Sequence, residues 1–98
     1  MIDQLKRLEA ARIQLLPAGE IPKHFVLERG GFVVLVERTE GGFGQLGGAG
    51  LLTGHGFAAL VWRAGKPFFV AKNIDLPADG RQVEELRAFA EDVKTALR

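Results

Sequence analysis

Residues 24–38 read HFVLERGGFVVLVER, two runs of β-branched, aromatic and aliphatic residues separated by Gly30 and Gly31. Two glycines between such runs supply the positive φ angles that a tight primed hairpin turn requires. A two-residue loop also sets the register, because each residue on one strand then has a defined partner on the other. The predicted cross-strand pairs are His24 with Glu37, Phe25 with Val36, Val26 with Leu35, and Leu27 with Val34.

A second hairpin is predicted further along the chain. Residues 57–72 read FAALVWRAGKPFFVAK, in which Ala64-Gly65-Lys66 separates two apolar runs and forms the predicted turn. Pro67 has no backbone N–H and cannot donate a ladder hydrogen bond, so we expect it at the beginning of a strand or at a sheet edge.

Helices are predicted at both ends of the chain. Asp79 can cap the C-terminal helix, with Gln82 three residues later as in a capping box. Apolar residues then recur on one side of that helix, at Val83, Leu86, Phe89, Ala90, Val93 and Leu97. The N-terminal block, from about Asp3 to Leu16, also has helical periodicity, and Pro17 ends it.

These elements predict a single α+β domain over residues 1–98. Its expected architecture is a four-stranded antiparallel meander sheet, made of two hairpins and flanked by the terminal helices in the order α-β-β-β-β-α. Residues 41–56 hold eight glycines in sixteen positions. Because ordering each glycine costs about 0.5–1 kcal/mol relative to alanine, this segment is expected to be a loop, which can include a bulged or irregular strand around residues 51–53.

Both faces of the predicted sheet are apolar. Phe57, Ala59 and Val61 alternate with Ala58, Leu60 and Trp62, and the neighbouring strands behave in the same way. If both helices cover one face, an apolar patch of several hundred Å² stays exposed on the other, and such patches mark interaction sites. A homodimer through a sheet face or a strand edge is therefore expected. The alternative is a monomer with one helix on each face.

Composition excludes several classes of protein. The 98 residues are 47% hydrophobic and 26% charged, which is typical of a globular domain. A formal net charge of +1 gives no electrostatic reason to expect nucleic acid as a partner. Without cysteine there is no disulfide framework or thiolate nucleophile. No signal peptide or apolar membrane helix is recognised, so a cytoplasmic protein without membrane association is expected.

Three motif matches carry no cofactor prediction. Residues 42–47 have the spacing G-x-G-x-x-G, but neither a following helix nor the required acidic residue is present. The same glycines followed by Lys72 match a kinase loop and its lysine, without the aspartates that a kinase needs. Gly65-Lys66-Pro67 has proline where a phosphate-binding loop needs a hydroxyl residue. We therefore expect no cofactor, and no metal site either.

His55, Arg63 and Lys72 are the candidate site residues. The favoured function is a non-catalytic, homo-oligomeric module that binds a partner protein or a small ligand through loop 41–56 and the adjacent strand ends. The first alternative is a hydrolase-like or isomerase-like enzyme that uses His55 with a carboxylate from elsewhere in the chain. The second is a weak nucleic-acid binder that uses Arg63, Lys66 and Lys72 beside aromatic side chains.

Overall fold

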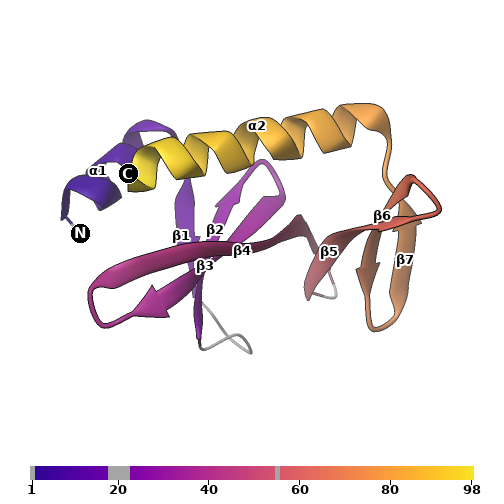
Figure 1. Ribbon diagram of the computed structural model, residues 1–98, viewed down its shortest axis with the longest axis horizontal. Helices are drawn as coiled ribbons and strands as arrows, with labels where there is room; N and C mark the ends of the chain where they lie inside the picture. The colour runs from indigo at the N-terminus through magenta and orange to yellow at the C-terminus, as the bar shows by residue number, and fades with distance from the viewer. Residues whose placement is uncertain (1, 18–22, 55) are drawn as a thin grey trace.

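The computed structural model describes residues 2–17, 23–54 and 56–98, and contains two helices and seven strands (Figure 1). In chain order the elements are α1 (Ile2–Ala10), β1 (Gln14–Leu16), β2 (His24–Arg29), β3 (Phe32–Thr39), β4 (Gly42–Thr53), β5 (Gly56–Arg63), β6 (Lys66–Ala71), β7 (Ile74–Pro77) and α2 (Gly80–Leu97). The strands form one antiparallel meander sheet in the order β1 to β7. The prediction of four strands is therefore wrong. The terminal positions of the helices agree with the structure.

The first hairpin has the predicted register. His24 lies opposite Glu37, and the three apolar pairs between β2 and β3 are also as expected. Gly30 and Gly31 have φ angles of 63° and 89°, the left-handed region that a primed turn uses. β5 and β6 form the second hairpin, in which Arg63 pairs with Lys66 across Ala64 and Gly65.

The first helix is shorter than predicted, because the chain reverses at Arg12. Arg12 has a φ of 62°, its N–H donates to the Glu9 carbonyl, and the Ile13 N–H donates to the Leu8 carbonyl, both at 2.9 Å. These two bonds form a Schellman motif, which ends a helix and satisfies its last carbonyls. Residues 14–16 are then free to pair with β2 as a strand instead of continuing the helix.

The glycine-rich segment is not a loop, because Gly42–Thr53 forms β4, the longest and most central strand. At two successive places, two residues along β3 correspond to three residues along β4. The pairs that show this are Val34 with Ala49, Val36 with Leu46, and Arg38 with Phe43. Each extra residue is a β-bulge, which bends and twists a strand. At Gly50 a Cβ would overlap the Ala58 carbonyl. Glycine thus permits the bends that the sheet requires.

Both helices lie on the same side of the sheet (Figure 1). Asp79 caps α2 as predicted, since its side chain accepts from the Gln82 N–H at 2.7 Å and its own N–H donates to the Gln82 side chain at 3.0 Å. The core between helices and sheet is formed by apolar residues from both layers, including Leu8, Ile13, Phe25, Leu27, Phe32, Val34, Val36, Ala58, Phe69, Leu86, Phe89, Val93 and Ala96.

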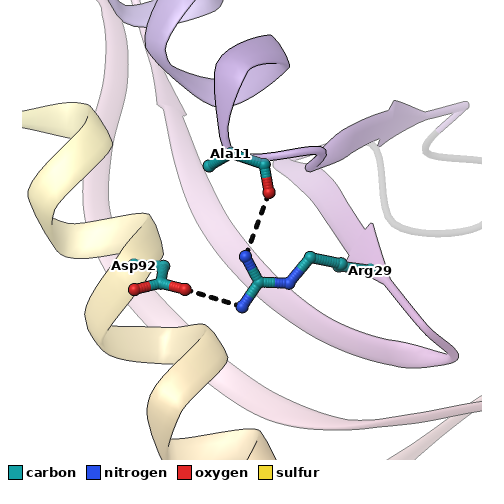
Figure 2. A network of polar contacts seen from close by, with 3 residues as sticks. All are labelled: Ala11, Arg29 and Asp92. Carbon is teal, nitrogen blue, oxygen red and sulfur yellow. Dashed lines mark hydrogen bonds and ion pairs between the residues drawn. The ribbon is translucent and has the colours of Figure 1, made fainter.

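Arg29 joins three elements at one end of this core (Figure 2). Its guanidinium donates to the Ala11 carbonyl at 3.0 Å and to Asp92 of α2 at 2.7 Å, and it lies 5.2 Å from the centroid of the Phe89 ring. Charge-assisted hydrogen bonds of this kind are stronger than neutral ones. Arg29 therefore ties the end of α1 and the last turns of α2 to β2.

Side chains of α1 also satisfy the carboxyl end of α2. Arg7 donates to the carbonyls of Ala96 and Arg98, each at 2.7 Å, and Gln4 donates to the carbonyl of Leu97 at 2.9 Å. The last carbonyls of a helix have no intrahelical partner, and cations are favourable there. The two ends of the chain are thus held together. Among the described residues, no helix is both long and apolar enough to span a membrane.

Candidate functional site

Residues 42–53 form strand β4 and not the predicted binding loop. His55 lies outside the described residues, so the proposed imidazole–carboxylate pair has no geometry to report. The residues around it close the β4–β5 turn, where the Thr53 hydroxyl donates to the Gly56 carbonyl at 2.8 Å.

The three candidate cations do not form one patch. Arg63 is paired with Asp75 of β7 at 2.6 Å, and its guanidinium lies 5.4 Å from the Phe68 ring centroid. Lys66 is next to Arg63 at the β5–β6 turn, whereas Lys72 follows the opposite end of β6. A groove that binds the phosphate backbone of a nucleic acid needs adjacent cations that are not neutralised by acidic side chains. Here the three cations are distributed over the two ends of β6, and one of them is neutralised.

The aromatic side chains expected beside these cations are divided between the two faces. Phe69 is buried in the core at 1% exposure, and Trp62 lies on the same side of the sheet as Phe69. Phe57 and Phe68 lie on the opposite side, because side chains alternate along each strand. A stacking platform for bases needs its aromatic rings on one surface, which these residues do not provide.

The described residues contain no group of three or more histidine and acidic side chains that could hold a metal ion. A shallow hollow of about 420 Å³ lies between α1 and β1 and is lined mainly by Leu5, Leu8, Ile13 and Leu15. A second, of about 300 Å³, is bordered by Arg29 and Asp92, which bind each other. Glu9 and Arg12 also line the first hollow, but neither hollow contains a histidine from the described part of the chain.

The side of the sheet that faces away from both helices, here called the helix-free face, is mostly apolar. It is formed by alternate residues of the strands, whose register is set by the pairs Val26–Leu35, Gly50–Ala59 and Val61–Phe68. Its apolar members are Leu16, Val26, Val33, Leu35, Leu52, Phe57, Ala59, Val61, Phe68 and Val70. No described helix covers them.

The centre of the helix-free face is filled by side chains that lean over the glycines of β4. A Cβ at Gly48 would lie 3.8 Å from the Phe57 ring, and one at Gly47 would lie 3.7 Å from Nε2 of His24. His24 Nδ1 is itself buried, without a hydrogen-bond partner in the described part of the chain. Because Gly47 and Gly48 have no side chains, the rings of His24 on β2 and Phe57 on β5 can lie over β4, and no β4 side chain protrudes between them.

The two edges of the sheet are poor surfaces for pairing. β1 has three residues and is followed by Pro17, and β7 has four residues and ends at Pro77. Short edge strands, prolines and charges all discourage a further strand from adding to a sheet. The sequence left open whether association uses a face or an edge, and these features favour the helix-free face.

No protein-family model matches the chain, and no curated protein or solved structure is similar to it at a significant level. The functional conclusion therefore depends on the helix-free face and its chemistry. Two acidic residues lie on this face, Glu28 and Glu37. The sequence does not single out Glu28 as a site residue, and it indicates Glu37 only as a partner for a histidine. Because side chains alternate along β2 and β3, the sequence already places both glutamates on one side of the hairpin. Only the order of the strands shows which residues of the other strands share that face.

Proposed function

We propose that this protein is a non-catalytic module that self-associates through its helix-free face, with a homodimer as the smallest closed assembly. The observation that supports this proposal most directly is the position of the helices. Both pack on one side of the sheet, and the strand residues that alternate toward the other side are mostly apolar. Leu52 on that face is 44% exposed. Val26 and Val33 are buried by their neighbours, at 7% and 0% exposure, so the open apolar surface is formed by Leu52 and the partly buried members of the face. Apolar surface that no second layer covers is typical of interaction sites.

The size of the face is adequate for a dimer. Seven strands spaced about 4.8 Å apart, with an average length of roughly 20 Å, give an outline of at most roughly 650 Å² per copy. Two copies would bury at most roughly 1,300 Å², near the lower end of the range for specific, stable complexes. Side chains of two sheets stacked face to face interdigitate about 10 Å apart, as in a β-sandwich.

The test is sedimentation of the 10.7 kDa chain at micromolar concentration, with a matched pair of variants. Leu52 and Leu76 have similar exposures of 44% and 48%, but Leu76 lies opposite Phe69 and so faces the helix side of the sheet. We expect a dimer for the unmodified chain and for Leu76→Glu, and a monomer for Leu52→Glu. The burial of a carboxylate in an apolar interface is costly, which is the reason for the difference.

Circular dichroism of each variant tests whether it is folded. A second variant on the helix-free face, Val61→Glu, should also be monomeric if the whole face, and not only the surroundings of Leu52, forms the interface. A single monomeric species for the unmodified chain at these concentrations contradicts the proposal. Equal loss of association in Leu52→Glu and Leu76→Glu contradicts the assignment to the helix-free face.

A further inference from the structure

The charged residues of the helix-free face are separated by sign between the two halves of the sheet. On the β2–β3 half they are acidic, Glu28 and Glu37. The cations of the same strands, Arg29 and Arg38, lie on the helix side, where each is stacked on a phenylalanine ring. This half of the helix-free face therefore has negative charge without a compensating cation from its own two strands.

The β5–β7 half is basic. Arg63 and Lys66 flank the β5–β6 turn, and Lys72 is in the β6–β7 turn. The one acidic residue of these strands, Asp75, is bound to Arg63 at 2.6 Å. Lys66 and Lys72 are exposed, and neither takes part in an ion pair described for residues 2–17, 23–54 and 56–98. The excess positive charge of this half comes from these two lysines.

The antiparallel order of the strands places these charges at matching ends of the sheet. The β3–β4 and β5–β6 turns lie at one end, and the β2–β3 and β6–β7 turns lie at the other. Glu37 is therefore near the same end as Lys66, and Glu28 is near the same end as Lys72. The central strand, β4, lies between the acidic half and the basic half.

We infer that two copies pair face to face about a two-fold axis that runs along β4, an inference that rests on the proposed function. Such an axis places β3 of one copy over β5 of the other, and β2 of one copy over β6 of the other. The end of the sheet that holds the β3–β4 and β5–β6 turns then lies over the same end of the second copy. Glu37 of one copy then faces Arg63 and Lys66 of the other, and Glu28 faces Lys72. Each contact occurs twice, because a two-fold interface uses the same surface on both copies.

The apolar centre and the charged flanks have different roles in this pairing. Burial of the apolar residues stabilises the complex without direction. Complementary charges determine orientation, because a pairing that places like charges opposite each other is disfavoured. A pairing rotated so that β2 and β3 stack on β2 and β3 would bring the four glutamates of two copies together. The charge pattern therefore selects the arrangement in which unlike halves meet.

Charge reversal tests this arrangement directly. A cationic variant carries Glu28→Lys and Glu37→Lys, and an anionic variant carries Lys66→Glu and Lys72→Glu. In either variant alone both halves of the face have the same sign, so self-association should weaken at least about tenfold. An equimolar mixture should associate as a heterodimer, and the variant with all four changes should dimerise like the unmodified chain. Sedimentation and native mass spectrometry distinguish these species.

A control variant, Glu84→Lys with Glu91→Lys, adds the same charge to exposed positions of α2. It should dimerise like the unmodified chain. If it weakens association as much as the cationic variant, net charge is responsible and the inference is wrong. If neither charge variant differs from the unmodified dimer, or the mixture does not associate, the two-fold arrangement is wrong while the proposed function stands. A monomeric unmodified chain overturns the proposed function instead.

Discussion

Arg12 occupies a backbone conformation that favours glycine. Within the described chain, Arg12 and Ala64 are the non-glycine residues with positive φ, at 62° and 49°. An L side chain in this region costs roughly 1–2 kcal/mol, since its Cβ approaches the following carbonyl. Arg12 is nevertheless the residue at which α1 ends, and the buried pair Leu8 and Ile13 makes the apolar contact that accompanies a Schellman motif.

Replacement of Arg12 by glycine should therefore stabilise the protein, by about 0.5–1 kcal/mol in urea unfolding. Ala10→Gly, two residues earlier in helical conformation, is the matched control and should destabilise by up to about 1 kcal/mol. A loss of stability in Arg12→Gly would show that the exposed Arg12 side chain contributes more than its backbone strain costs.

Among the elements, β4 contributes most to the shape of the sheet. It pairs with β3 through two bulges and with β5 at Gly50, where the two backbones approach too closely for a side chain. Two bulges and a close approach within twelve residues explain why a strand has the composition of a loop. The glycines of β4 thus have a structural role, which places the β2–β3 and β5–β6 hairpins on either side of it.

Gly50→Ala should be severely destabilising, by about 2 kcal/mol or more, because its methyl group would overlap the backbone of Ala58. Gly48 is two residues away on the same strand and face, and a Cβ there would make only an ordinary contact of 3.8 Å with Phe57. Gly48→Ala should change stability by no more than about 0.5 kcal/mol. Thermal unfolding of the two variants checks both values, and equal effects would contradict the close approach at Gly50.

The whole molecule is a two-layer structure with its helices on one side. Arg7 and Gln4 hold α1 against the end of α2, and Arg29 fastens both to the sheet. Because all of these contacts keep the helices together, neither helix covers the second face of the sheet. Two apolar faces and one helical layer leave a surface that a second copy can cover.

Dimerisation through that surface should make thermal stability depend on concentration. Ligands that bind only the native state raise its stability, and a second copy acts as such a ligand. A hundredfold increase in protein concentration should raise Tm by roughly 7 °C for a dimer of this size. The Leu52→Glu variant should show no such dependence. A concentration-independent Tm in the unmodified chain would indicate a monomer.

Local patterns predicted part of this structure well. Gly30 and Gly31 between β-forming runs determine a hairpin and its register, and Asp79 with Gln82 determines where α2 begins, because turn and cap chemistry acts over a few residues. The same reasoning failed at residues 14–16 and at β4. Helical periodicity in the first block was overridden by pairing with β2, and glycine content indicated a loop where neighbouring strands impose a bulged strand.

The candidate site divides in the same way. Alternation along residues 32–36 and 57–62 shows from the chain alone that both faces of the sheet are apolar, since side-chain direction in a strand has a period of two. The order of the seven strands determines which face the helices cover. It also determines that Glu28 and Lys66 lie on opposite halves of the uncovered face. That order is set by contacts between residues far apart in the chain, whose cooperative packing no local pattern records.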